Sequence, residues 1–336
     1  MNTPSKLFII AEAGVNHNGN IETAMKLIDC ASLLGADAIK FQTFRAKNFV
    51  KKNTPKVKYQ KNNDKNKSHF QMIQKLELSF DDFYKMKKYC DKKKIEFIST
   101  PYDLESLDFL KKIKVKSIKT ASADLSDIML HKSIAKLNAR TIISTGMFNI
   151  AEIKKTLSVY GNNKNIELLH CVSNYPCSYE SLNLNNIRTM RNQLKLPVGF
   201  SDHSLGYDSA IIAYMLGART FEKHLTLSKR MKGPDHKASS DPKELKLYIK
   251  KIKLINTILG SKIKKTRSEE IQMKKISCKS ITTRYFINKN SIITEDNIIM
   301  KRPGTGLSGY NLKKILGKKT KKKLNNDYQI KLSDIK

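Results

Sequence analysis

The amino-acid sequence alternates short apolar segments with helix-compatible segments eight times between Leu7 and Leu259. Each apolar segment has the character of a buried parallel strand, and polar residues follow where the strand would end. Eight strand–helix pairs over this length are typical of a closed (β/α)₈ barrel, an α/β fold whose functional site lies at the carboxyl ends of the strands. We therefore expect a TIM barrel over residues 1–259.

Helix start and stop signals support these boundaries. Asn20 is an expected N-cap, Gly35 an expected helix stop, and Ser79–Asp82 resembles a Ser-x-x-acid helix start. The predicted strands cover residues 7–11, 38–41, 96–99, 117–119, 141–144 and 166–170, with a seventh beginning at Val198 and an eighth ending at His224. The predicted helices cover residues 21–34, 79–93, 104–112, 128–137, 150–160, 187–193, 208–216 and 242–259.

The pattern changes after the barrel segment. Residues 260–275 have the composition of a linker, and residues 276–336 contain short β-leaning pieces separated by turns, which predict a small α+β or β-rich domain. The lysine run at residues 318–323 is typical of a solvated face. A long basic stretch at residues 45–67 exceeds an ordinary connection, so we expect a functional loop or a partly mobile one.

A formal net charge of +34 raises the question of nucleic-acid binding. The lysines are spread along the whole chain, tryptophan is absent, and no aromatic residues interleave with the basic runs. Proteins that bind single strands need such aromatic platforms, so we expect no nucleic-acid partner. The positive field would nevertheless attract an anionic substrate.

Cysteine use and hydropathy bear on the compartment. The five cysteines show no Cys-x-x-Cys spacing, which favours reduced thiols in a cytoplasm over a disulfide framework. No apolar run is long enough to cross a bilayer, and residues 1–6 do not resemble a signal peptide. The sequence therefore predicts a cytoplasmic protein without a membrane partner.

Two histidines end the seventh and eighth predicted strands, at His203 and His224. Because consecutive strands of a parallel sheet are usually adjacent, the two imidazoles can converge at one edge of the sheet. Two neutral imidazoles with open positions beside them can hold a divalent metal ion. The alternative is a pair of unrelated histidines that hydrogen-bond the loop backbone.

Other polar side chains collect at the same strand ends. A lysine near the end of a buried strand carries a desolvation cost, so Lys40 and Lys119 beside hydroxyls and imidazoles favour an anion-binding pocket. The sequence has no P-loop, no Rossmann glycine fingerprint and no zincin motif. The polar residues at the strand ends are Glu12, Lys40, Gln42, Thr100, Lys119, Ser122, Ser144, Tyr175, Ser201, His203 and His224.

Taken together, eight short motifs resemble the sialic acid synthase family, which makes N-acetylneuraminate and related nonulosonic acids. They follow one another in the family's order across nearly the whole chain, and the C-terminal part resembles the family's antifreeze-like (SAF) domain. The motifs are Ile10–Gly19, Lys40–Phe44, Ser99–Pro101, Ser144–Met147, Ser201–His203, Glu222–His224, Gly233–Ser239 and Lys301–Gly304.

The resemblance implies a reaction. Enzymes of this family condense phosphoenolpyruvate with an N-acylated mannosamine-type sugar and release phosphate. They need a divalent cation, often Mn²⁺, with Mg²⁺ or Co²⁺ as alternatives. By resemblance His203 and His224 are the metal ligands, and the ion would act as a Lewis acid on the sugar aldehyde and as a template.

The resemblance also implies roles for single residues. Glu12 would orient or deprotonate the water that attacks C2, or else serve only as a charge partner for a pocket lysine. Lys40 and Lys119 would neutralise phosphate and carboxylate. Arg302 would reach into the barrel of a second chain and contact the N-acyl group, which implies a domain-swapped homodimer. Hydroxyl contacts would come from Thr100, Ser122, Ser144, Tyr175 and Ser201, and sugar contacts from Gln42, Asp124 and Asp235.

Two departures from the family pattern concern substrate contacts. Asp124 stands where some members have Glu, and Ser173 stands where some have Asn. The Gly233–Ser239 run resembles N-acetylneuraminate and N,N'-diacetyllegionaminate synthases more than pseudaminate synthases. We expect N-acetylmannosamine as the sugar, with 2,4-diacetamido-2,4,6-trideoxymannose, the legionaminate precursor, as the alternative.

Two hypotheses of other classes remain open. The high charge is compatible with a non-catalytic basic binding protein built on an inactive barrel. The small C-terminal domain alone could be a pure oligomerisation module.

Overall fold

A computed structural model of the protein describes residues 6–55, 68–137, 139–163 and 165–336. Residues 1–5, for which no signal peptide is expected, lie outside the described residues. So do residues 56–67 of the predicted basic loop. The chain divides into two compact units, Met1–Leu259 and Gly260–Lys336. No helix of the described part is long and apolar enough to cross a membrane.

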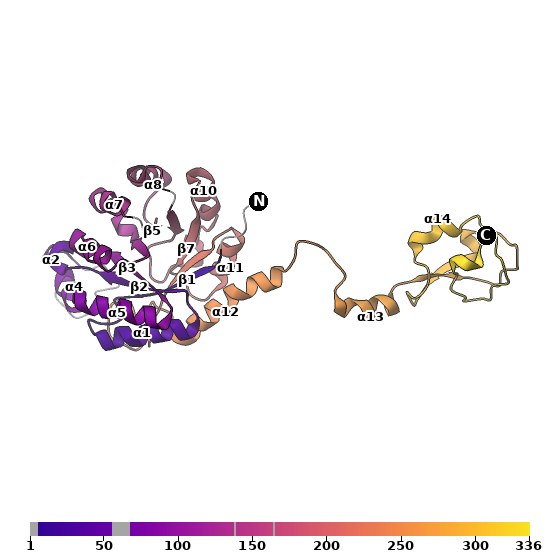
Figure 1. Cartoon of the computed structure of the whole chain (residues 1–336), viewed down its shortest axis with the longest axis horizontal. Coiled ribbons are helices and arrows are strands. Elements are labelled where there is room, and N and C mark those ends of the chain that lie inside the picture. Colours follow the sequence, from indigo (N-terminus) through magenta and orange to yellow (C-terminus); the bar gives the residue numbers. More distant parts are fainter. Residues whose placement is uncertain (1–5, 56–67, 138, 164) are drawn as a thin grey trace. The chain divides into compact units, whose positions relative to one another are not determined.

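The first unit is a closed parallel barrel, which confirms the predicted (β/α)₈ fold (Figure 1). Each strand pairs with its neighbour in chain order, and the eighth pairs with the first in parallel register. The strands are β1 (Phe8–Gly14), β2 (Ala38–Thr43), β3 (Glu96–Pro101), β4 (Ser117–Thr120), β5 (Arg140–Ser144), β6 (Ile166–His170), β7 (Val198–Asp202) and β8 (Thr220–His224).

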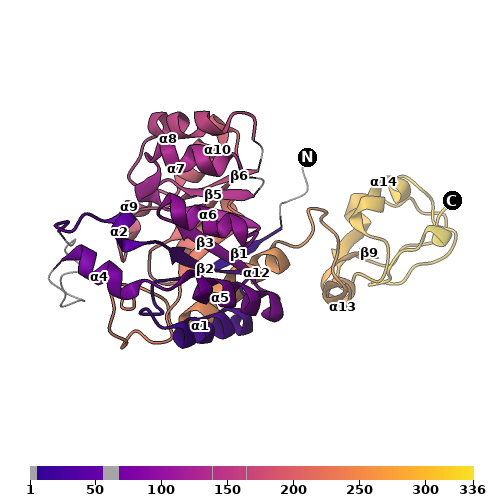
Figure 2. The same ribbon diagram turned by 60° about the vertical axis from the view of Figure 1, so that its left-hand side comes forward.

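Helices lie outside the ring of strands (Figure 2). Two of them, α2 and α4, belong to the connection between β2 and β3. The helices are α1 (Ile21–Leu34), α2 (Ala46–Phe49), α4 (His69–Leu76), α5 (Phe80–Lys93), α6 (Leu104–Lys112), α7 (Ile128–Ala135), α8 (Ile150–Leu157), α9 (Tyr179–Leu182), α10 (Asn185–Leu194), α11 (Asp208–Met215) and α12 (Pro242–Leu259).

The expected helix caps are present. The Asn20 side chain accepts a hydrogen bond from the Thr23 amide at 2.8 Å, and Gly35 ends α1 with φ 80°, a conformation that favours glycine. Ser79 and Asp82 form a reciprocal capping box at the start of α5. These local signals fix where α1 begins and ends and where α5 begins.

Three apolar clusters hold the barrel unit together. The largest lies between strands and helices, and a smaller one fills the barrel interior with Ile10, Ala38, Ile98, Ile142 and Leu169. These five side chains are fully buried, as expected for a packed barrel core that is not a pore. A third cluster forms around α4 and is described with the site below.

The second unit has an apolar core of its own and contains α13 (Ser268–Ser277), β9 (Ser280–Thr283), β10 (Ile298–Lys301) and α14 (Leu312–Ile315). β9 and β10 pair in antiparallel fashion. Helix α13 begins inside the predicted linker at residues 260–275, and none of its residues is buried. The helix therefore forms without contributing to a core, and this is why apolar periodicity did not predict it.

Candidate active site at the carboxyl ends of the strands

A cavity of about 380 Å³ opens at the carboxyl ends of the barrel strands. This volume is within the range of small-molecule sites. The sequence-predicted site residues that line it are Glu12, Lys40, Gln42, Thr100, Lys119, Ser122, Ser144, Ser173, Tyr175, Ser201, His203, His224 and Asp235.

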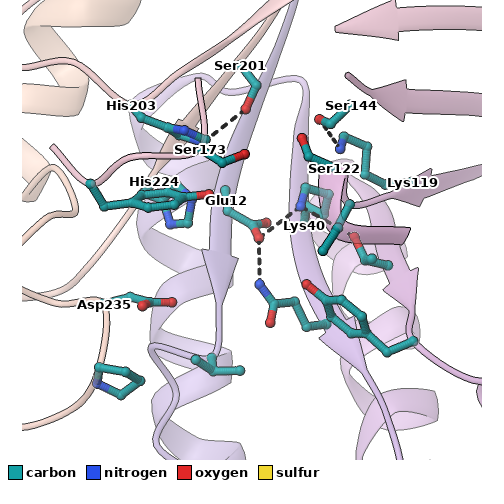
Figure 3. A pocket seen from close by; sticks show the side chains of 18 of the residues that line it. Glu12, Lys40, Lys119, Ser122, Ser144, Ser173, Ser201, His203, His224 and Asp235 are labelled. Carbon is teal, nitrogen blue, oxygen red and sulfur yellow. Dashed lines mark hydrogen bonds and ion pairs between the residues drawn. The ribbon is translucent and has the colours of Figure 1, made fainter. Parts of the chain in front are cut away.

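Strand geometry explains why these side chains meet. Successive strand residues alternate between the barrel interior and the helix layer, so Glu222 and His224 of β8 both face inward. In the parallel register Glu12 stands opposite Lys40 on one side and opposite His224 on the other. Figure 3 shows Lys119 on one side of the cavity and the imidazoles on the other, with Glu12 between them.

A buried charge cluster occupies the centre of the cavity. The Lys40 ammonium lies 2.8 Å from Glu12 Oε1 and 3.7 Å from Glu222 Oε2. Burial alone would lower the pKa of Lys40, but these two carboxylates raise it above its ordinary value, so the group stays cationic. Gln42 Nε2 donates to Glu12 Oε1 at 3.3 Å, whereas the buried Glu12 Oε2 accepts no hydrogen bond from the described residues.

The pKa values of the two carboxyl groups in this cluster, Glu12 and Glu222, are shifted in opposite directions. Burial raises the pKa of Glu12, and the nearby Glu222 carboxylate adds to the rise against the opposing effect of Lys40. Burial would also raise the pKa of Glu222, but Lys119 and Lys40 lower it to about 2. Paired groups whose pKa values diverge in this way mark acid and base roles. The pKa of Glu222 is thus lowered and that of Glu12 raised, so Glu12 is the better candidate for proton exchange.

Lys119 is a second buried cation, 2% exposed. Its ammonium donates to Ser144 Oγ at 2.5 Å and to the Thr120 carbonyl at 2.8 Å. Burial lowers the pKa of Lys119 from its ordinary value, and the nearby Glu222 carboxylate opposes that change. An incoming anion would compensate the desolvation of this cation, which is the arrangement expected of a phosphate or carboxylate subsite.

The His203 and His224 rings lie together, with centroids 5.6 Å apart and planes at 67°. His203 Nδ1 lies 2.6 Å from the Val172 carbonyl oxygen, so it donates its proton there and leaves the Nε2 lone pair facing the cavity. Burial lowers the pKa values of His203 to about 4 and of His224 to about 3, which keeps both rings neutral. Tyr175 packs on His203, with centroids 4.1 Å apart.

This donor set fits a divalent cation, because neutral imidazole nitrogen is a common metal ligand. Within the described residues no group of three or more His, Cys, Asp or Glu side chains is arranged to hold a metal ion. An ion bound by the two imidazoles would therefore need further ligands of other kinds, and substrate and water can supply them.

Two predicted site residues do not line the cavity. Asp124 lies on the short 3₁₀ helix Ser122–Asp124, directly after lining residues Ser122 and Ala123, and burial raises its pKa to about 7. Its Oδ2 atom is buried and accepts no hydrogen bond from the described residues. Arg302 belongs to the second unit, Gly260–Lys336.

Glu222 is a cavity residue that sequence reasoning missed. It is 4% exposed, accepts a hydrogen bond from Ser201 Oγ at 3.0 Å, and carries the lowered pKa described above. The signal was available, because Glu222 precedes His224 by two positions on a strand and must share its face. The wall around α4 was also missed; it includes Met72, Ile73 and Leu76.

Comparison with known proteins places this architecture in a family. Residues 27–264 match the NeuB family, and residues 279–336 match the SAF domain. An N,N'-diacetyllegionaminic acid synthase from Campylobacter jejuni is 41% identical over 331 residues, covering 97% of this chain and 99% of that protein. A protein of the same name from Legionella pneumophila is 40% identical, covering 92% of this chain and 89% of that protein.

A solved structure agrees with these relatives. The crystal structure of an N-acetylneuraminic acid (sialic acid) synthetase from Leptospira borgpetersenii superposes with a TM-score of 0.70 at 33% identity, covering 80% of this chain and 90% of that one. The chain therefore belongs to the NeuB family, a group of transferase enzymes that includes legionaminic and sialic acid synthases, and it carries a C-terminal SAF domain.

Proposed function

We propose that this chain condenses phosphoenolpyruvate with 2,4-diacetamido-2,4,6-trideoxymannose and water, giving N,N'-diacetyllegionaminate and phosphate. The sequence motifs favour N-acetylmannosamine, but the relatives at 40% and 41% identity support the alternative better. N-acetylmannosamine remains a second candidate because of the similarity to the Leptospira synthetase structure.

The observation that carries the proposal is the pair of buried ammonium groups, Lys40 and Lys119, in a cavity that also holds two neutral imidazoles. Phosphoenolpyruvate carries a phosphate and a carboxylate, and two fixed cations in a low-dielectric cavity suit both. The hydroxyls of Ser122 and Ser144, on the same side of the cavity as Lys119, would supply further hydrogen bonds (Figure 3).

The chemistry then follows from charge. C3 of phosphoenolpyruvate forms a bond to the aldehyde carbon of the open-chain sugar, and the aldehyde oxygen takes a proton and becomes a hydroxyl. Positive charge develops at C2, where water adds and loses a proton. Glu12 Oε2, buried and without a hydrogen-bond donor among the described residues, is the base for that proton. The tetrahedral intermediate expels phosphate and leaves the 2-keto acid.

His203 and His224 would hold the divalent cation, Mn²⁺ being the first choice. When bound, such an ion supplies Lewis-acid polarisation of the sugar carbonyl. The protein's own contribution is the fixed tautomer of His203, set by the hydrogen bond to the Val172 carbonyl. We also propose a homodimer in which Arg302 of one chain contacts the N-acyl group of the sugar bound by the other.

Phosphate release tests this function. We expect metal-dependent release of phosphate from phosphoenolpyruvate only when an acylated mannosamine-type sugar is present, and loss of release on chelation with EDTA. His203→Ala and His224→Ala should abolish release while circular dichroism stays native. Reactions without sugar are the control. A folded protein that releases no phosphate with either candidate sugar and Mn²⁺ lacks this activity.

A further inference from the structure

The active-site cavity has two unlike parts. Its inner part is polar and carries Glu12, Lys40, Lys119 and Glu222. Its other wall, which we call the α4 wall, is mainly apolar, and His69 of α4 and Tyr102 line the cavity beside it. The α4 wall consists of Val15, Phe49, Met72, Ile73 and Leu76.

The α4 wall is a built surface with its own packing. Val15, Met72, Ile73 and Leu76 are 2–8% exposed and belong to an apolar cluster that is distinct from the main barrel core. The cluster is closed by aromatic contacts, since the Phe49 ring stacks on Tyr102 with centroids 4.4 Å apart. Side chains held in this way form a surface of fixed shape.

Chain connectivity places the α4 wall nearer the mouth than the charge cluster. Val15 directly follows the end of β1, three residues after Glu12, and Phe49 follows β2 beyond Lys40 and Gln42. Parallel strands leave a barrel at their carboxyl ends, so residues after those ends lie farther out than residues within them. The charge cluster is therefore the inner layer, and the α4 wall stands above β1, β2 and β3.

The position of the charge cluster below the α4 wall suggests an orientation for the acceptor sugar, an inference that rests on the proposed function. The aldehyde carbon must reach C3 of phosphoenolpyruvate in the inner, cationic layer. The far end of the open chain, C4 to C6, then extends toward the mouth and meets the α4 wall. The five apolar side chains of the α4 wall gain free energy from contact with a methyl group and offer no hydrogen bond to a hydroxyl group.

We propose that the α4 wall is the specificity surface for the far end of the acceptor, binding a C6 methyl group and discriminating against a C6 hydroxymethyl group. Met72 and Ile73 of α4 are its central residues. This selects 6-deoxy acceptors among acylated mannosamines, by a surface that belongs to the β2–β3 connection and not to the barrel strands.

A matched substrate pair tests the surface in the unmodified enzyme. N-acetylmannosamine and its 6-deoxy analogue differ only at C6, so the ratio of their kcat/KM values reports that position alone. We expect the 6-deoxy sugar to be preferred by about tenfold or more, within the range that apolar pockets achieve. Equal values, or preference for the hydroxymethyl sugar, would overturn the proposal.

Two variants test whether Met72 and Ile73 cause the preference for the 6-deoxy sugar. Met72→Gln keeps the side-chain length and adds an amide, and Ile73→Thr keeps the branched shape and adds a hydroxyl. Each should lower the preference for the 6-deoxy sugar by about tenfold and leave KM for phosphoenolpyruvate unchanged. The control is Met215→Gln, the same substitution on α11 at a side chain that is 59% exposed; it should leave the preference unchanged.

The outcomes separate the two levels of inference. If wild type, Met72→Gln and Ile73→Thr are all active and show the same preference at C6, the α4 wall does not determine specificity at C6, and the proposal is wrong. If folded wild type releases no phosphate with any acylated sugar, it is the proposed function that fails. If Met72→Gln does not fold, Ile73→Thr and the wild-type substrate pair decide.

Discussion

At the scale of single residues, the informative contrast is between Glu12 and Glu222, two buried carboxylates that share Lys40. Ser201 donates to Glu222 and Gln42 donates to Glu12, and each carboxylate keeps its Oε2 atom without a hydrogen bond from the described residues. A base needs a free lone pair and a pKa above that of a fully stabilised anion. Both carboxylates have the lone pair, and the raised pKa singles out Glu12. We propose on this basis that Glu12 is the base and not only a charge partner of Lys40, the two roles that the sequence left open.

Glu12→Gln distinguishes these roles. If Glu12 is the base, kcat for phosphate release falls by about 10²- to 10⁴-fold, because the amide cannot accept the proton from water. If Glu12 only balances Lys40, the freed ammonium binds phosphoenolpyruvate more tightly and kcat changes little. Steady-state kinetics with both substrates varied, on protein shown to be folded by circular dichroism, measures the difference.

The sequence predicted the polar residues at the ends of the barrel strands more readily than the ion pairs and hydrogen bonds between them. Lys40 and Lys119 were identifiable because a cation in a buried strand needs a reason. Glu222 was not identified, although it precedes His224 by two positions, because a carboxylate inside a strand has no partner visible in the sequence. Its partners, Lys40 and Ser201, come from β2 and β7, and only closure of the barrel brings them together.

At the scale of elements, β7 and β8 are joined by a buried ion pair that faces away from the cavity. Lys223 lies 3.2 Å from Asp202, at 6% and 0% side-chain exposure, and donates to the Ser204 carbonyl. Asp202 also accepts from the Ser204 amide, at 2.9 Å, and from Ser209 Oγ, at 3.0 Å. These contacts fix the chain on both sides of His203 and therefore set its position relative to His224.

Asp202→Asn should lower the free energy of unfolding of the barrel unit by about 3–5 kcal/mol, because it leaves the Lys223 ammonium buried without its counter-charge. Urea denaturation measures the change. Asp91→Asn is the control: it removes an exposed ion pair with Lys87 on α5, where Asp91 is 56% exposed, and should cost less than about 0.5 kcal/mol. An equal loss of unfolding free energy in the two variants would show that the buried Asp202–Lys223 pair stabilises the fold no more than an exposed ion pair does.

The elements also show where local sequence signals suffice. The predicted bounds of α1 were correct because Asn20 and Gly35 act through hydrogen bonds within a few residues. The sequence analysis assigned no element to residues 69–76, where α4 forms. Ser68 provides a local start signal, since its side chain accepts a hydrogen bond from the Gln71 amide, but the helix has only eight residues. Its buried side chains pack on Val15 and Phe44, which are far away in the chain. A helix this short is marginal by itself, so tertiary contacts stabilise it and the wall that it builds.

At the scale of the whole molecule, the chain consists of two units with separate apolar cores. Units of this kind fold around their own cores and can be related differently in a monomer and in an assembly. The barrel unit holds all the cationic, hydroxyl and imidazole groups of the cavity, but the described residues include no arginine in its lining. This leaves the N-acyl group of the sugar as the part of the substrate for which a residue of the second unit, Arg302, is proposed.

Arg302→Ala tests that assembly. If Arg302 closes the site of a partner chain, the variant remains a dimer by light scattering, KM for the sugar rises about tenfold or more, and KM for phosphoenolpyruvate is unchanged. That rise is the size expected when one charged hydrogen-bond donor is lost. Arg284→Ala, at another exposed arginine of the second unit, is the matched control and should leave both constants unchanged. A variant that loses the dimer but keeps sugar affinity would assign the second unit to oligomerisation alone, because the barrel would then bind its substrates without help from Arg302.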